Sequence, residues 1–151
     1  MERFETHNYL PQDAVDIRKA VFIEEQGFSD EFDKIDESAV HVIMYEGQNP
    51  AAVCRIYYSE SHNCYSIGRI AVAKAYRKKH YGAKILSYAE KEVYKIGSAK
   101  HCDSNAFVVG LSAQKQAVGF YEKQGYHPVG NFYLDENCLH LWMEKIISKS
   151  D

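Results

Sequence analysis

The stretch Ser66–Leu86, SIGRIAVAKAYRKKHYGAKIL, predicts a strand, a basic turn and the start of an amphipathic helix. The apolar residues that end in Ile70-Ala71-Val72 indicate the strand, and Arg77–His80 supply the basic turn before Gly82. The first N–H groups of a helix have no partner within the helix, and the helix dipole adds partial positive charge there. Converging N–H groups of this kind suit a pyrophosphate. On charge alone a solvated basic turn is the commoner explanation. The choice between such a turn and an anion site therefore depends on features in the rest of the chain.

Length and composition limit the classes of protein that fit. The chain has 151 residues, of which 46% are hydrophobic and 26% charged, and this is typical of one globular domain with a real core. A net charge of −3 argues against a nucleic-acid partner, whereas the local basic cluster fits a small phosphorylated ligand. No apolar run is long enough to span a membrane, and the first residues do not resemble a signal peptide. We therefore expect a cytoplasmic protein without a membrane partner.

Several other kinds of site are disfavoured by spacing. The cysteines, Cys54, Cys64, Cys102 and Cys138, include no CxxC pair and are expected to be reduced and mostly buried. The two His–Cys groupings, around residues 101–102 and 138–140, lack the short paired spacing of a zinc site, so no metal is predicted. The patterns of a P-loop and of a hydrolase nucleophile elbow are both absent.

Hydrophobic periodicity and turn residues predict the elements of the first half of the chain. They are a short strand at Arg3–Thr6, a helix from Pro11 to Gly27, an acidic loop at Ser29–Glu37 with a helical turn near Phe32, a hairpin of Val40–Glu46 and Ala51–Tyr58, and a strand at Cys64–Val72.

The second half of the chain completes an α+β domain. The elements predicted here are a helix that ends at Gly97, a strand at His101–Val109, a helix capped by Ser112 and running to Lys123, and a strand pair of Val129–Leu134 and Leu139–Ile146. Gly119 within the last helix weakens it, which suggests close approach of another backbone or of a ligand.

Taken in order, several segments resemble the GNAT superfamily of N-acetyltransferases, and its ElaA-like subgroup in particular. The similar segments are RKAVFIEEQ (18–26), EFDKIDESAVH (31–41), AAVCRIY (51–57), IGRIAV (67–72), AQKQAVGFYEKQGY (113–126) and LHLWMEK (139–145). The resemblance implies the acyl-CoA N-acyltransferase fold in one domain over residues 1–151. In that fold a central mixed, mostly antiparallel sheet is splayed at the cofactor site and flanked by helices.

The superfamily's coenzyme A signature is Arg or Gln, two residues, Gly, one residue, then Gly or Ala. The chain matches it with Arg77 and Gly82 but has His80 where the first glycine stands. A glycine there allows backbone angles that are costly to other residues. Histidine tolerates the left-handed region better than most residues, and its ring adds a donor for phosphate. We therefore expect coenzyme A binding to persist in weakened form.

The resemblance also implies how the cofactor is held. The strand Ile70, Ala71 and Val72 would hydrogen-bond the pantetheine arm. The turn would hold the pyrophosphate through Arg77, Lys78, Lys79, His80, Tyr81, Gly82 and Ala83. Asn105 would reach the acetyl or pantetheine end, and Phe120 would line the thiol end.

For the chemistry, the resemblance points to Tyr121 as the general acid. A phenol has a reference pKa of ~10, above the ~8.5 of a thiol, so it acts by a hydrogen bond that stabilises the departing thiolate. A tyrosine that merely faces the core is the alternative. A backbone N–H near Val72 is expected to stabilise the oxyanion.

The general base is less well defined by sequence. The candidates on segments expected to face the acceptor are Glu24, Glu25, Asp36, His41, Asp135 and His140, of which His140 and Glu25 are preferred. Glu24, Asp36 and Arg55 are predicted to bind the acceptor, although a solvated acidic loop is the commoner use of such residues. Arg55 and Arg69 interrupt apolar strands and should each pair with a carboxylate, in the site or in a structural bridge.

The predicted function is direct transfer of an acetyl group from acetyl-coenzyme A to a small-molecule or peptide amine in a ternary complex. A coenzyme A-binding sensor or partner protein without catalysis is the alternative on the same fold. Neither the identity of the amine nor the choice between monomer and homodimer follows from the sequence.

Overall fold

The structure is a computed structural model that describes residues 1–149, and its chain forms two units. One unit contains residues 1–57 and 67–89, and the other contains residues 58–66 and the chain from residue 90 onward. An eight-stranded open sheet has the strand order β1-β2-β3-β4-β5-β8-β6, with β7 paired to β8. The β4–β5 pairing is parallel, which makes the sheet mixed. The expected fold class is confirmed, while the single domain stays a prediction.

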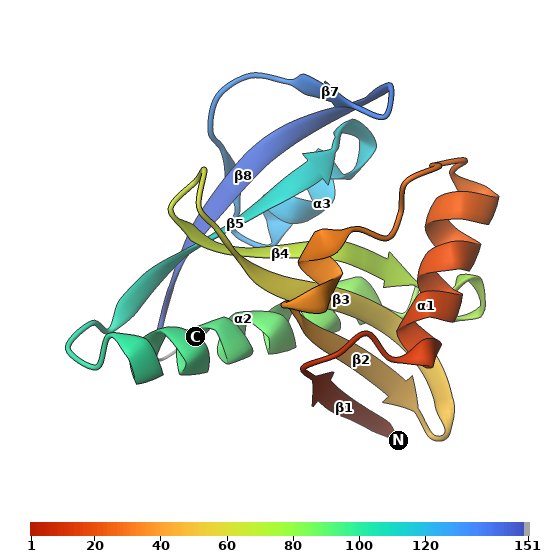
Figure 1. The fold of residues 1–151 in the computed structure, drawn as a ribbon, viewed down its shortest axis with the longest axis horizontal. Coiled ribbons are helices and arrows are strands. Elements are labelled where there is room, and N and C mark those ends of the chain that lie inside the picture. Colours follow the sequence, from red (N-terminus) through yellow and green to blue (C-terminus); the bar gives the residue numbers. More distant parts are fainter. Residues whose placement is uncertain (150–151) are drawn as a thin grey trace. The chain divides into compact units, whose positions relative to one another are not determined.

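The first unit contains β1, β2 and most of β3 and β4, and β1, β2 and β3 lie side by side in Figure 1. Their bounds are β1 (Glu2–His7), β2 (Val40–Glu46), β3 (Asn49–Ser59) and β4 (Cys64–Val72). The ladders β1–β2 and β2–β3 are antiparallel. The opening strand, the hairpin and the strand Cys64–Val72 are therefore confirmed.

The predicted first helix is present in two parts, α1 (Gln12–Arg18) and the π-helical segment η1 (Lys19–Glu25). Pro11 is its N-cap, and Gly27 follows it with φ 78°. Its apolar residues pack against strands β2, β3 and β4; the buried cluster consists of Ala14, Ile17, Val21, Phe22, Ile43, Tyr45, Val53 and Ala71. The helical turn of the acidic loop is η2 (Lys34–Glu37), which begins after Phe32 rather than around it.

After β4 the chain makes a short 3-10 turn, η3 (Lys74–Tyr76), and then enters α2 (Tyr81–Lys100). The prediction that Gly97 ends this helix is wrong, because the helix continues to Lys100. Gly97 is instead a contact point: a Cβ there would lie 2.9 Å from Cε1 of Phe107. The glycine therefore allows close packing and does not stop the helix.

The largest error of the sequence prediction concerns the strand after α2. The strand β5 spans Ala106–Gln114 rather than His101–Val109, so the proposed helix cap Ser112 lies within it. The strand continues because Leu111 and Ala113 are buried on one face while Ser112 is exposed on the other. The helix that follows is short and consists of η4 (Lys115–Ala117) and α3 (Val118–Lys123).

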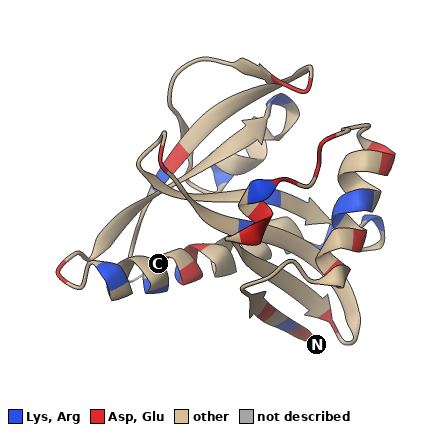
Figure 2. Ribbon diagram, viewed as in Figure 1, with Lys and Arg blue, Asp and Glu red and all other residues tan. Residues whose placement is uncertain are grey.

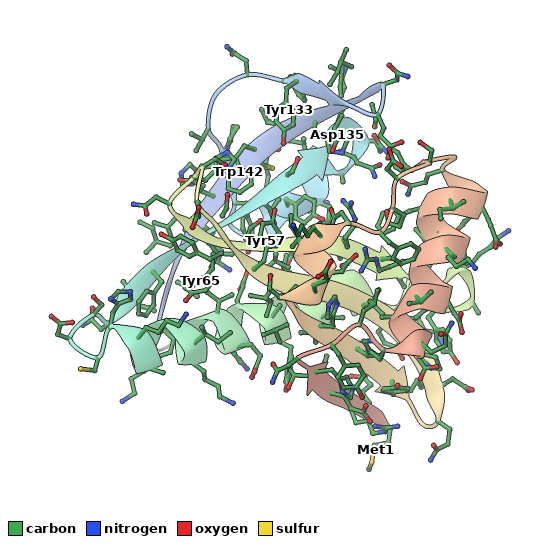
Figure 3. The ribbon with its side chains drawn as sticks, viewed as in Figure 1. Met1, Tyr57, Tyr65, Tyr133, Asp135 and Trp142 are labelled. Atoms are coloured by element: carbon green, nitrogen blue, oxygen red, sulfur yellow. The ribbon has the colours of Figure 1, made fainter. Side chains whose placement is uncertain are left out.

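The closing strands are β6 (His127–Pro128), β7 (Tyr133–Asp135) and β8 (Cys138–Ser148). β5 and β8 pair antiparallel along their lengths and run side by side in Figure 1. The predicted pair of closing strands is confirmed as β7 and β8, although β7 is shorter than expected. Figure 3 shows Tyr133 and Asp135 at this hairpin and Trp142 further along β8.

Candidate functional site

The guanidinium group of Arg77 in the basic turn is held by an ion pair. Its Nη1 and Nη2 atoms donate to the two carboxylate oxygens of Glu25 at 2.8 and 2.7 Å. Its Nε atom donates to the backbone carbonyl of Val72 at 3.1 Å. The side chain of Arg77 thus joins the end of η1 to the end of β4. The sequence predicts base and acceptor-binding residues in the first of these segments and pantetheine-binding residues in the second.

The backbone of the turn adopts the left-handed conformation at two residues, Lys78 with φ 69° and His80 with φ 64°. His80 thus has the backbone angle for which a signature glycine would be suited. The side chains of Lys78, Lys79 and His80 are exposed. The turn can therefore present both lysines and the first N–H groups of α2 to an anion.

Tyr81 does not project from this turn, because its side chain is only 4% exposed. Its hydroxyl donates to Glu46, and this hydrogen bond, with burial, raises the pKa of Tyr81 to about 12. The adjacent Gly82 and Ala83 lie half-buried in the first turn of α2. A ligand at this turn would therefore contact the backbone of Tyr81, Gly82 and Ala83 rather than their side chains.

The end of β4 lies beyond the residues that pair with β5. Within the described residues, its parallel ladder with β5 consists of two pairs, Tyr65↔Val109 and Ser66↔Gly110. Arg69, beyond those pairs, has φ 50°, an irregularity within the strand. Of the predicted pantetheine-binding residues that follow, Ala71 is buried while Ile70 and Val72 are half-buried.

The direction of the last peptide groups of β4 follows from one hydrogen bond. The N–H of Ala73 donates to the carbonyl of Ala51 on β3 at 2.8 Å. Because the C=O and N–H of a trans peptide point in opposite directions, the carbonyl of Val72 points away from β3. It is this carbonyl that accepts the hydrogen bond from Arg77.

The acidic loop between η1 and η2, red in Figure 2, is part of a buried ion network. Arg18 donates to Glu31 at 2.8 Å and to both oxygens of Asp36 at 2.8 and 3.0 Å. Arg55 donates to Asp33 at 2.6 and 3.1 Å and to Asp36 at 2.9 Å. Arg69 contacts both Glu31 and Asp33. Three arginines thus balance three carboxylates.

Asp36 is fully engaged within this network. Burial alone would raise its pKa, but hydrogen bonds from Arg18, from the backbone N–H of Asp33 and from Arg55 hold the pKa well below its usual range. For Glu31 the balance is reversed, since burial raises its pKa more than Arg69 and Arg18 lower it. The carboxylate of Asp36 accepts from four donors and has no capacity left for a proton or an amine.

Arg18 is a member of the network that the sequence reasoning missed. A signal for it was present: Ala14, Ile17, Arg18 and Val21 lie on one face of the helix, so an arginine occupies an apolar stripe. A charged residue in such a position must have a buried partner. Within the network, the Nε atom of Arg55 is a buried donor for which the described residues provide no acceptor.

His41, another candidate base, is buried beside the same network. Its Nε2 atom lies 2.9 Å from the backbone carbonyl of Asp36. Burial lowers the pKa of His41 despite the favourable contacts with Asp36. Burial thus disfavours the charged imidazole, and the ring helps to hold the chain at Asp36 through its contact with the carbonyl.

In the second unit, Tyr121 lies half-buried on α3 among aromatic rings. Its ring is edge-on to Phe120, with centroids 5.1 Å apart, and to Tyr126, with centroids 6.1 Å apart. Tyr126 is anchored through its hydroxyl, which donates to Glu90 at 2.7 Å, and Glu90 also binds Lys145 at 3.0 Å. The aromatic group is thus held by a buried polar contact.

His140, on β8, is buried with one ring nitrogen engaged. Its Nδ1 atom lies 2.9 Å from the carbonyl of Cys138, and because a carbonyl only accepts, Nδ1 carries the proton. Nε2 is then the basic nitrogen of the neutral ring. Tyr133 stacks on this imidazole with centroids 6.0 Å apart.

Of the remaining predicted residues, Asn105, Glu24 and Asp135 are exposed, whereas Arg55 is buried. Asn105 lies in the loop before β5, so its predicted position within a strand is wrong. Glu24 is near the end of η1, and Asp135 is at the end of β7. Both carboxylates face solvent. Arg55, predicted to contact the acceptor, has its Nη atoms engaged with Asp33 and Asp36.

All four cysteines are free thiols, and Cys54 and Cys64 are buried whereas Cys102 is exposed. Among residues 1–149, no cluster of three or more His, Cys, Asp or Glu side chains could hold a metal ion. In the same part of the chain, no helix is both long and apolar enough to cross a membrane.

Comparison with known proteins gives concordant matches. Residues 8–147 match the family described as an acetyltransferase (GNAT) domain. The uncharacterized protein YyaT of Bacillus subtilis is 32% identical over 143 residues, which cover 91% of this chain and 90% of that protein. The uncharacterized N-acetyltransferase YjcF of the same organism is 31% identical over 137 residues, which cover 89% and 91%.

Solved structures show the same fold. The crystal structure of Escherichia coli ElaA has a TM-score of 0.79 with 22% identity and covers 96% of this chain and 99% of that chain. An aminoglycoside 6'-N-acetyltransferase complexed with coenzyme A has a TM-score of 0.71 with 16% identity and covers 99% of both chains.

Proposed function

We propose a reaction for this chain on the ground that it belongs to the GNAT family of acetyltransferases. The chain is an acyltransferase, and we propose that it binds acetyl-coenzyme A and transfers the acetyl group directly to an amine in a ternary complex. The acceptor is a small-molecule or peptide amine. A cytoplasmic setting stays a prediction, and between monomer and homodimer no choice is proposed.

The observation that carries this proposal is the left-handed backbone of the basic turn. Lys78 and His80 both have positive φ angles immediately before the N-terminus of α2. Left-handed residues in a turn are a feature of backbone nests, in which N–H groups converge on a concave side that suits a diphosphate. The helix dipole and the exposed side chains of Lys78 and Lys79 add positive charge to it. Histidine at position 80 preserves the conformation that the signature glycine provides.

The strand that leads into the turn supplies the second part of the cofactor site. The carbonyl of Val72 points away from β3, so once Arg77 releases it the end of β4 offers a hydrogen bond to an amide-bearing arm laid along it as an added strand. Ile70 and Ala71 precede it on the same strand, beyond the two residue pairs that join β4 to β5. A backbone N–H in this segment is the proposed donor to the oxyanion.

For the transfer itself, a base takes a proton from the amine, the nitrogen bonds to the thioester carbon, and the carbon–sulfur bond breaks. We propose that the hydroxyl of Tyr121 gives a hydrogen bond or proton to the departing thiolate, with Phe120 beside it. His140 is the preferred base, because its Nδ1–H is used by the Cys138 carbonyl and Nε2 is left as acceptor.

Glu25 is less suited to be the base than the sequence indicated. The hydrogen bonds from Arg77 lower the pKa of its carboxyl, and a weaker base accepts a proton from an ammonium group less readily. Asp36 and Arg55 hold the loop between η1 and η2 rather than contacting the acceptor. Glu24 stays as the proposed carboxylate for a cationic acceptor.

The second candidate function is a coenzyme A-binding protein without catalysis. Two observations favour it: a histidine stands at the first signature glycine, and the base candidates Glu25 and Asp36 are already engaged by arginines. The first departs from the cofactor signature, and the second leaves fewer groups that could take a proton from the amine.

The test is thermal unfolding with and without excess acetyl-coenzyme A, for the wild type and for Arg77→Ala. Ligand at ~100 times its dissociation constant stabilises by about 2.7 kcal/mol, a melting shift of roughly 5 to 10 °C for a chain of this size. A shift in the wild type that is smaller in the variant supports the site. Thiol release with a panel of amines then separates the two candidates, and the absence of any shift refutes both.

A further inference from the structure

We propose that Glu25 is an internal competitor of coenzyme A, because its carboxylate occupies the guanidinium of Arg77 that the diphosphate of the cofactor would bind. The inference rests on the proposed function, since it concerns the same turn. It adds a residue outside the signature, at the end of η1, that sets the affinity for the cofactor.

The ion pair has the geometry of a good substitute ligand. Both terminal nitrogens of Arg77 donate to Glu25, one to each carboxylate oxygen, at 2.8 and 2.7 Å. A guanidinium binds carboxylate and phosphate through the same planar fork, so the two anions compete for the same pair of donors. Lys74, which also lowers the pKa of Glu25, places a second positive charge near the carboxylate.

The same side chain also covers the other part of the proposed cofactor site. The Nε atom of Arg77 donates to the carbonyl of Val72, which points away from β3. A pantetheine amide that pairs with the end of β4 would need this carbonyl. Three donors of one arginine therefore have to be released or rearranged when the cofactor binds.

The expected energetic effect is modest because both partners are partly exposed to solvent, with side chains 39% (Arg77) and 33% (Glu25) exposed. Exposed ion pairs contribute little to stability, and bidentate pairs lie at the upper end of that range. Removing the competing carboxylate should therefore lower the dissociation constant of coenzyme A by about two- to fivefold.

The experiment is isothermal titration of coenzyme A into the full chain for the wild type, Glu25→Gln and Glu60→Gln. Glutamine preserves the shape of the side chain and removes the charge. Glu60 is the control, because it is also an exposed glutamate, lies in the turn between β3 and β4 and has no place in the proposed site. We expect Glu25→Gln to bind about two- to fivefold more tightly and Glu60→Gln to stay close to the wild type.

A double-mutant cycle with Arg77→Ala shows whether the effect passes through that arginine. In the Arg77→Ala background, Glu25→Gln should produce no further gain. Equal affinities of wild type and Glu25→Gln, an equal gain in Glu60→Gln, or a gain that survives in Arg77→Ala would each overturn the inference. A wild type that binds no coenzyme A would overturn the proposed function as well, so the two failures are distinguishable.

Discussion

Gly110 of β5 lies so close to the indole of Trp142 on β8 that a Cβ at residue 110 would overlap the ring, at 2.8 Å from Cε2. The two residues are diagonal neighbours in the antiparallel ladder, where Gly110 pairs with Glu144 and Ser112 with Trp142. The imidazole of His62 stacks on the same indole, with centroids 3.5 Å apart. Packing of the second unit at this point thus depends on the absence of a side chain.

Gly110→Ala is expected to lower the free energy of unfolding by about 1–3 kcal/mol, because the indole or the backbone must move. The matched control is Gly119→Ala in α3, where an added Cβ would meet no atom within 4 Å. That substitution should be neutral or stabilise by up to about 1 kcal/mol, since alanine favours helix. Urea unfolding of both variants tests the pair, and equal stabilities would contradict the packing argument.

Arg18→Met should destabilise the protein by about 3–5 kcal/mol, because Glu31 and Asp36 would be left as buried carboxylates without their main partner. Arg18→Lys retains the charge but loses the forked hydrogen bonds, so its stability should lie between those of Arg18→Met and the wild type. Urea or thermal unfolding gives the order. If Arg18→Lys is as stable as the wild type, the fork geometry has no role.

The same network predicts a dependence of stability on pH. The pKa of Asp36 is lowered in the folded chain, so its contribution is complete above the pKa of ~3.9 of an unfolded aspartate and is lost as the pH falls below it. The pKa of Asp33 is also lowered, by Arg55 and Arg69 against burial, and acts in the same direction. The raised pKa of Glu31 acts in the opposite direction.

Because the shift of Asp36 is the largest of the three, the free energy of unfolding should decline from about pH 5 to pH 2. Arg18→Met removes the hydrogen bonds from Arg18 that lower the pKa of Asp36. The free energy of unfolding of this variant should therefore decline less steeply as the pH falls. Urea titrations at several pH values measure both slopes. Parallel slopes would mean that Arg18 does not hold that pKa down.

The left-handed angle of His80 makes glycine the preferred residue at that position. A side chain in this region costs roughly 1–2 kcal/mol, and glycine loses part of the gain through chain entropy. His80→Gly should therefore stabilise by about 0.5–1 kcal/mol and bind coenzyme A more tightly, whereas His80→Ala should destabilise. Thermal unfolding and titration calorimetry measure both effects. Weaker binding by His80→Gly would instead assign a phosphate contact to the imidazole.

Tyr121→Phe should lower kcat by about 100-fold with little change in the affinity for acetyl-coenzyme A, as expected for a group that acts on the leaving thiolate. The control is Tyr9→Phe, which removes the hydroxyl of a tyrosine that is 62% exposed. Thiol release and calorimetry provide the two measurements. An unchanged kcat would leave Tyr121 as a packing residue only.

The elements of the first half of the chain were predicted well because each depends on residues that are neighbours in sequence. The hairpin of Val40–Glu46 and Ala51–Tyr58 follows from two continuous apolar runs on either side of a turn cluster, and both signals act locally. The stop assigned to Gly97 failed because the role of that glycine depends on Phe107, which is distant in sequence. The cap assigned to Ser112 failed because its strand is held by β8.

The candidate site also combines features that are local in sequence with features that depend on the fold. The signature at Arg77–Ala83 and its place directly after a strand could be predicted from the sequence alone, since a turn and a helix N-terminus form from consecutive residues. Only the tertiary structure decided that Arg77 binds Glu25, 52 residues away, and that Arg18 neutralises Glu31 and Asp36. Ion pairs of this kind depend on which segments the fold brings within about 3 Å, and hydrophobic periodicity carries no information about partners.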